Sequence, residues 1–155
     1  MELDASQLYA DKTWVCTSLA MSDAEKKALL FSAKEYGESL AILGLKFHIE
    51  KLASGSMLRW GGNKGLLIAA NFESFEFQGI FTINQFANAC VVSVYKQWLG
   101  DSFFMVNHSA EARRRVVIDK LQSLELIDYF YLVDYVIDKV SDFLTAALNE
   151  MVELR

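Results

Sequence analysis

The chain has 155 residues, of which 53% are hydrophobic and 13% aromatic, so the sequence is too apolar to remain disordered. Its net charge of −5 at pH 7 argues against binding to nucleic acid or to an anionic membrane surface, because both attract basic proteins. The sequence contains no proline, so no rigid proline-rich linker divides it, and we expect a single domain over residues 1–155.

The N-terminal residues are acidic, and no basic segment followed by an apolar one marks a secretory signal peptide. No apolar run reaches the roughly 18 residues that would cross a bilayer. These features predict a cytoplasmic protein with no membrane partner. Cys16 and Cys90 lie far apart in the sequence, each among apolar residues. We expect buried free thiols, with a single disulfide as the alternative.

The first half of the chain begins with a β-prone segment, residues 13–19, which is expected to form a strand or an extended arm. Ser22 and Glu25 then have the spacing of a capping box, in which each side chain binds the backbone amide of the other residue. A helix is predicted from there to about Leu43. Gly44 is placed to end this helix in a left-handed conformation.

Short strands are predicted to follow this helix. Residues 45–50 alternate strictly between apolar and polar side chains, as in a half-buried strand. Gly79 is a candidate β-bulge. The other predicted strands are residues 57–60, 66–72, 75–83, 90–95 and 103–107. Their connections are too short for helical crossovers, so the pattern predicts an α+β fold with an antiparallel meander of about five strands.

Two helices are predicted after the strands, near residues 110–124 and over residues 126–154. The second is long and has apolar residues spaced alternately four and three apart, which places them on one stripe. The stripe consists of Leu126, Phe130, Val133, Ile137, Val140, Leu144, Ala147, Met151 and Leu154. In one interpretation the stripe covers the chain's own sheet or first helix. In the other, its second half binds another chain, and the predicted interface residues are Ile137, Val140, Leu144, Ala147, Met151 and Leu154.

Charged residues on the two C-terminal helices are candidates for electrostatic contacts. The predicted helix near residues 110–124 carries a run of arginines near its start, and the helix over residues 126–154 carries aspartates at intervals of four. These candidates are Arg113, Arg114, Arg115, Asp134, Asp138 and Asp142. The arginines are expected to face solvent or to pair with the aspartates of the same or a neighbouring chain. A phosphate or RNA contact is the lesser alternative.

No sequence motif indicates catalysis or a cofactor. The glycine-rich residues 61–65 lack the Lys-Ser/Thr pair and the following helix that define a phosphate-binding loop. His48 and His108 are remote from each other, and no Cys/His cluster has the spacing of a zinc site. We therefore expect no metal and no cofactor. A nucleophile and base that meet only in the fold, such as Cys90 and His108, stay open as an alternative.

The preferred hypothesis is a non-enzymatic protein-binding module that forms a homo-oligomer, since the apolar residues are concentrated in the long helix. In size, acidity and order of elements the chain resembles small secretion chaperones, immunity proteins and phage-encoded inhibitors, which implies binding to another protein. The alternative is a small-molecule sensor or enzyme with an aromatic pocket between sheet and helices. That pocket would be lined by Trp60, Phe72, Phe75, Phe77 and Trp98.

Overall fold

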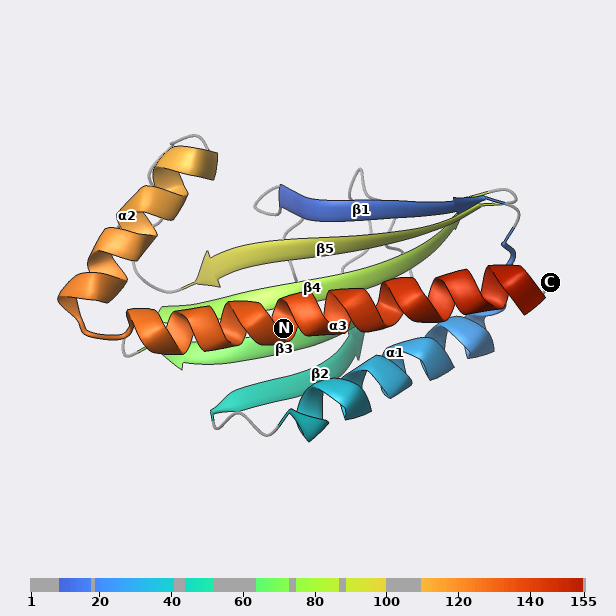
Figure 1. The fold of residues 1–155 in the computed structure, drawn as a ribbon, viewed down its shortest axis with the longest axis horizontal. Helices are drawn as coiled ribbons and strands as arrows, with labels where there is room; N and C mark the ends of the chain where they lie inside the picture. Colours follow the sequence, from blue (N-terminus) through green and yellow to red (C-terminus); the bar gives the residue numbers. More distant parts are fainter. Residues whose placement is uncertain are drawn as a thin grey trace.

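The computed structural model describes residues 9–17, 19–40, 44–51, 64–72, 75–86, 89–99 and 110–154. They form one five-stranded antiparallel sheet accompanied by helices, as Figure 1 shows. In chain order the elements are β1 (Tyr9–Thr17), α1 (Asp23–Ser39), β2 (Leu45–Lys51), β3 (Lys64–Phe72), β4 (Phe75–Phe86), β5 (Ala89–Leu99), α2 (Ala110–Ser123) and α3 (Ile127–Leu154). The predicted α+β fold, with an N-terminal helix and a long last helix, is confirmed.

The strand order in the sheet is β1-β5-β4-β3-β2. Strands β2 to β5 form a meander, as predicted, and each pairs with its neighbour in the chain. The predicted strands at residues 57–60 and 103–107 lie outside the described residues. The segment expected to be a strand or an extended arm is β1, which pairs with β5 and forms the opposite edge of the sheet. The register of this pair shifts between Ala10 and Lys12, so the edge strand is irregular near its start.

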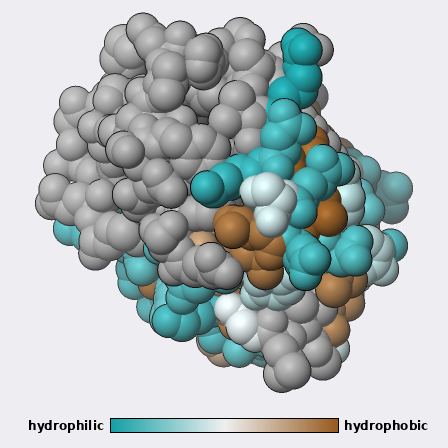
Figure 2. Space-filling view, turned by 90° about the vertical axis from the view of Figure 1, so that its left-hand side faces the viewer, coloured by the Kyte–Doolittle hydropathy of each residue, from teal (hydrophilic) through white to brown (hydrophobic). Residues whose placement is uncertain are grey.

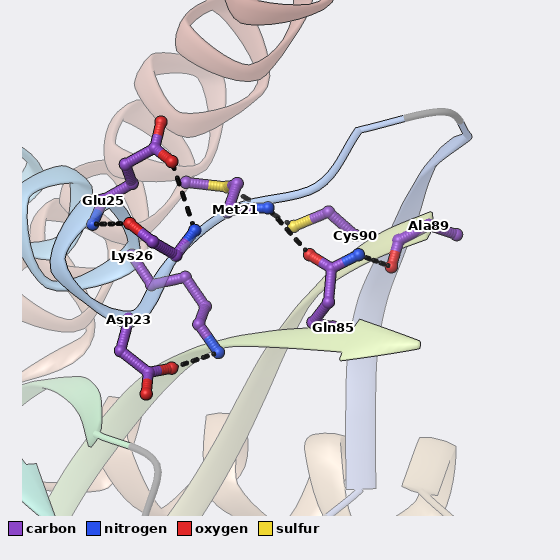
Figure 3. A network of polar contacts seen from close by, with 8 residues as sticks. Met21, Asp23, Glu25, Lys26, Gln85, Ala89 and Cys90 are labelled. Atoms are coloured by element: carbon purple, nitrogen blue, oxygen red, sulfur yellow. Dashed lines mark hydrogen bonds and ion pairs between the residues drawn. The ribbon is translucent and has the colours of Figure 1, made fainter. Parts of the chain in front are cut away.

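The predicted capping box begins α1 and is confirmed. The Glu25 amide donates to Ser22 Oγ at 3.1 Å, and the Ser22 amide donates to Glu25 Oε1 at 3.1 Å (Figure 3). The two bonds satisfy amide groups that the first turn of a helix leaves without a partner. The helix ends at Ser39 with Leu40 as its C-cap, so the prediction that Gly44 ends it is wrong. Gly44 does have a positive φ, 84°, just before β2.

Helices α1 and α3 both pack on one face of the sheet, with α3 lying along the central strands and α1 beside it (Figure 1). The core lies between the sheet and these helices. It contains side chains of the sheet, such as Phe81, and of α3, such as Ile137, both 0% exposed. Apolar burial of this kind is the main stabilising contribution in a domain of this size.

The predicted β-bulge at Gly79 is wrong. Strand β4 runs through this position in regular register, with Gly79 opposite Ile68 on β3 and Lys96 on β5. The glycine instead makes room for α3, because a Cβ atom at this position would lie 2.7 Å from Cδ1 of Ile137. Close approach of a helix, and not an irregular strand, accounts for the missing side chain.

Candidate interaction surface on the last helix

A tight turn separates α3 from α2. Glu125 has a φ of 59°, a left-handed conformation that is uncommon for residues other than glycine. The Leu126 amide donates to the Leu121 carbonyl at 2.9 Å and closes the turn. The chain changes direction here, and α2 leads away from the start of α3 (Figure 1).

The inner face of α3 is part of the chain's own core. Its residues are at most 6% exposed, and they are Phe130, Val133, Val136, Ile137, Val140, Leu144 and Leu148. Three residues that the sequence places in a partner interface belong to this set, namely Ile137, Val140 and Leu144, each 0% exposed. A partner could contact these three only if α3 left the sheet, so in this fold they are core residues.

The other predicted interface residues lie toward the end of α3. Ala147 and Met151 are partly buried against the same core, and Leu154 is 79% exposed. Val152 beside them is 39% exposed. The predicted apolar stripe therefore leaves the core gradually along the helix, and only its last residue is mostly accessible.

Aromatic side chains hold the start of α3 against the sheet. The ring of Phe130 meets Phe77 edge-on at 5.3 Å between centroids, and Tyr129 lies 5.1 Å from Phe72. Phe72 and Phe77, two residues of the predicted aromatic pocket, therefore pack directly against the helix. The remaining members, whose side chains lie outside the described part of the structure, are Trp60, Phe75 and Trp98.

Tyr129 lies at the boundary between the inner face and solvent. Its hydroxyl approaches Gly44, where an added Cβ atom would be 2.8 Å from that oxygen. Burial raises the pKa of the Tyr129 phenol above its ordinary value, because the charged phenolate is disfavoured away from water.

The outer face of α3 carries large apolar side chains that nothing in the described part of the chain covers fully. Tyr131, Leu132 and Tyr135 are each 50% exposed. Figure 2 views the end of the molecule that carries α2 and the start of α3, and shows hydrophobic side chains exposed there among hydrophilic ones. Neighbouring exposed side chains of this size often mark an interaction surface.

Opposite charges flank these apolar residues. Asp128, Leu132, Tyr135 and Lys139 are spaced four, three and four residues apart, so they form one stripe on the outer face. The Asp128 carboxylate is exposed at the first turn, where the helix dipole favours negative charge. The ammonium group of Lys139 lies 5.4 Å from the centre of the Tyr135 ring. We call these four residues the outer stripe.

The outer stripe is visible in the sequence as well, beside the predicted inner stripe that begins at Leu126, but the sequence alone did not identify it as a separate surface. Both stripes have the same spacing, and periodicity alone does not show which one faces the sheet. The inner stripe is longer and uninterrupted, whereas the outer stripe has apolar residues only at its two central positions.

Those of the predicted electrostatic residues whose side chains the structure describes have different surroundings. Asp134 pairs with Lys96 of β5 at 2.8 Å, and both side chains are about one-fifth exposed. This ion pair ties the flank of α3 to the sheet. Asp142 and Arg115 are exposed. Asp138 is half-buried, and the side chains of Arg113 and Arg114 lie outside the described residues.

The sheet face opposite α1 and α3 carries polar side chains that are also buried. They are Gln78, Thr82, Asn84 and Ser93, each at most 7% exposed. The Thr82 hydroxyl and Glu50 Oε2 have no hydrogen-bond partner in the part of the chain that the structure describes. Within that part, no group of three His, Cys, Asp or Glu residues could hold a metal ion.

None of the described helices is long and apolar enough to cross a membrane. No protein-family model matches the sequence, and no curated protein and no solved structure matches it. The outer face of α3, with its half-exposed apolar side chains between opposite charges, is therefore the feature on which we base a functional proposal.

Proposed function

We propose that the protein is a non-enzymatic protein-binding module that pairs with a second copy of itself through the outer face of α3. One observation carries the proposal: Tyr131, Leu132 and Tyr135 are each half-exposed on a helix whose opposite face already fills the core. Tyrosine is enriched in protein interfaces, and apolar surface gains about 25 cal/mol for each Å² removed from water. A partner helix lying on this face would supply that burial.

The charges on the outer stripe favour a second copy as the partner. Asp128 and Lys139 lie at equal distances along the helix from the midpoint between Leu132 and Tyr135. Two antiparallel copies of α3 related by a twofold axis through that midpoint place Leu132 of each copy opposite Tyr135 of the other. They also place each Asp128 opposite a Lys139. An isologous twofold contact of this kind is the commonest form of protein self-association.

A parallel arrangement of the two helices would be unfavourable. It would bring the two Asp128 carboxylates together and, at the other end, the two Lys139 ammonium groups. The charges therefore select the antiparallel orientation, while the apolar pair contributes most of the binding energy. One helix face on each copy is a small interface, and we expect a dissociation constant of about 1–100 µM.

The experiment is sedimentation equilibrium of the wild-type protein and of the charge-reversal variants Asp128→Lys and Lys139→Asp. Each variant carries two like charges on the outer stripe, so each should self-associate about tenfold more weakly than the wild type. An equimolar mixture of the two variants places unlike charges opposite each other again. We expect the mixture to form a heterodimer with an affinity close to that of the wild type.

The variant Glu153→Lys serves as the matched control, since it changes an exposed glutamate on the same helix, about 21 Å along the axis beyond Lys139. It should self-associate as the wild type does. The proposal would be wrong if the wild-type protein stayed monomeric at several times the upper expected dissociation constant. It would also be wrong if both charge-reversal variants dimerised normally by themselves.

A further inference from the structure

The two cysteines of the chain lie directly opposite each other in neighbouring antiparallel strands. Cys16 of β1 is the register partner of Cys90 of β5, and both are free thiols. Both pack against the core on the side of the sheet that α1 and α3 cover. Directly opposite residues in antiparallel strands have Cα atoms about 4.5–5.5 Å apart, a separation that disulfides also span.

The two thiols differ in their access to solvent. Cys16 is half-buried on an edge strand, whereas Cys90 is 0% exposed. Cys90 Sγ lies 3.6 Å from Met21 Sδ, as Figure 3 shows. Burial, and secondarily the nearby Cys16, raises the pKa of Cys90 to about 11, while Lys26 lowers it slightly. A small oxidant from solvent therefore reaches Cys16 first. Cys90 is buried and remains a protonated thiol.

Hydrogen bonds of the Gln85 side chain hold the backbone around Cys90 in place. The side-chain amide of Gln85 donates to the Leu19 carbonyl at 3.1 Å. It also donates to the Ala89 carbonyl at 2.9 Å, and its oxygen accepts from the Met21 amide at 3.0 Å (Figure 3). These bonds join the end of the β4–β5 hairpin to the segment between β1 and α1. Cys90 therefore keeps its place in the sheet, while the irregular strand β1 pairs on one side only among the strands that the structure describes.

We propose that Cys16 and Cys90 form a redox-active pair that a peroxide converts into a disulfide between β1 and β5. In the first step the thiolate form of Cys16 attacks one oxygen of the peroxide. The S–O bond forms, the O–O bond breaks, and with hydrogen peroxide the leaving oxygen departs as water after protonation. Cys16 is then a sulfenic acid, oxidised by two electrons, and the peroxide has been reduced.

In the second step the sulfur of Cys90 attacks the sulfur of Cys16. The S–S bond forms, the S–O bond breaks, and the hydroxide that leaves takes up the proton of the Cys90 thiol to give a second water. The overall change is two thiols and one hydrogen peroxide to one disulfide and two waters. Closing the bond requires the two Cβ atoms to approach by up to about 1 Å, a movement that the edge strand can make.

The experiment treats the purified protein with hydrogen peroxide, unfolds it, alkylates the remaining thiols and identifies the peptides by mass spectrometry. The wild type should lose about 2 Da and yield a peptide pair joined through Cys16 and Cys90. Its unfolding midpoint should rise by roughly 5 °C or more, and a reductant should reverse both changes, because the crosslink restricts the unfolded chain.

Cys16→Ser provides the matched control, because it removes the accessible thiol and leaves the buried one. In this variant Cys90 should stay reduced and be alkylated completely after unfolding. The proposal fails if peroxide carries wild-type Cys16 to sulfinic acid while Cys90 stays alkylatable. It also fails if the disulfide joins two chains, or if Cys90 is oxidised equally in Cys16→Ser.

Discussion

The inner and outer faces of α3 have the same periodic spacing but opposite surroundings. On the inner face, Ile137 is 0% exposed and lies against the bare backbone of Gly79. On the outer face, Leu132 and Tyr135 are 50% exposed and lie between Asp128 and Lys139. An apolar stripe on a helix thus predicts that another structural element covers it. Which element does so depends on residues outside the stripe.

The difference between the two faces lies in how closely their contacts are fitted. On the inner face, Gly79 of the sheet leaves space for the side chain of Ile137. At the flank of this face, Asp134 forms an ion pair with Lys96. The outer face has chemically matched charges at its two ends but no covering element in the described part of the chain. Substitutions on the inner face should therefore affect folding, and those on the outer face should affect association.

The largest expected effect comes from placing the same charge on each face in turn. Ile137→Asp buries a carboxylate with no partner in the core and should cost at least about 4 kcal/mol, a large part of the stability of a typical domain. Leu132→Asp changes an exposed position and should cost no more than about 1 kcal/mol. Thermal unfolding followed by circular dichroism measures both effects.

Leu132→Asp should still abolish self-association, because its carboxylate would lie opposite Tyr135 of the second copy. A folded and monomeric Leu132→Asp beside an unfolded Ile137→Asp is the expected pair of results. If Ile137→Asp kept the wild-type melting temperature, the assignment of the inner face to the core would be wrong. Unchanged dimerisation of Leu132→Asp would remove the outer face from the proposed interface.

A smaller effect is expected from filling the space under Ile137. Gly79→Ala places a Cβ atom 2.7 Å from Ile137 Cδ1 and 3.0 Å from its Cγ1, so the helix or the side chain must shift. We expect a loss of about 1–2 kcal/mol, as in other overpacked cores. Urea unfolding of the variant, compared with the wild type, measures this loss.

Ile137→Val tests whether that loss arises from the contact with α3, since valine lacks the Cδ1 methyl. Alone, it should cost about 1 kcal/mol through lost packing. In a protein that already carries Gly79→Ala, the change Ile137→Val should cost less than about 1 kcal/mol or nothing. The methyl group of the alanine then occupies part of the space that the isoleucine Cδ1 vacates. Additive costs in the double variant would show that Gly79 is required for a reason other than the approach of Ile137.

The sequence predicted the fold well where local rules determine it. The capping box at Ser22, the alternation in β2 and the spacing in α3 each depend on a few neighbouring residues, and all three predictions were confirmed. Gly79 was misassigned because its role depends on Ile137, which lies 58 positions later in the chain. Nothing within β4 itself distinguishes a glycine under a helix from a glycine in a bulge.

The candidate site was harder to predict for the same reason. Which stripe of α3 faces the sheet depends on tertiary packing, so the sequence left two interpretations open, and the predicted interface residues Ile137, Val140 and Leu144 lie in the core. The pairing of Cys16 with Cys90 depends on β1 returning to the edge beside β5. Spacing in the sequence carries no information about that return, so a pairing of the two thiols was only an alternative to two separate free thiols.

The smallest expected effect concerns Tyr129, at the boundary between the two faces. Burial raises the pKa of its phenol above the usual value of 10, so the folded state retains the proton at pH values where the unfolded state has lost it. The stabilisation is complete below pH 10 and is lost as the pH rises from 10 through the folded-state pKa. Tyr129→Phe removes this contribution, so its free energy of unfolding should fall less between pH 9 and 11 than that of the wild type. Urea unfolding at the two pH values measures the difference, and Cys90, present in both proteins, affects them equally. An identical alkaline loss in the two proteins would mean that the phenol is as well hydrated in the folded chain as in the unfolded one, and the boundary between the faces would then lie on the inner side of Tyr129.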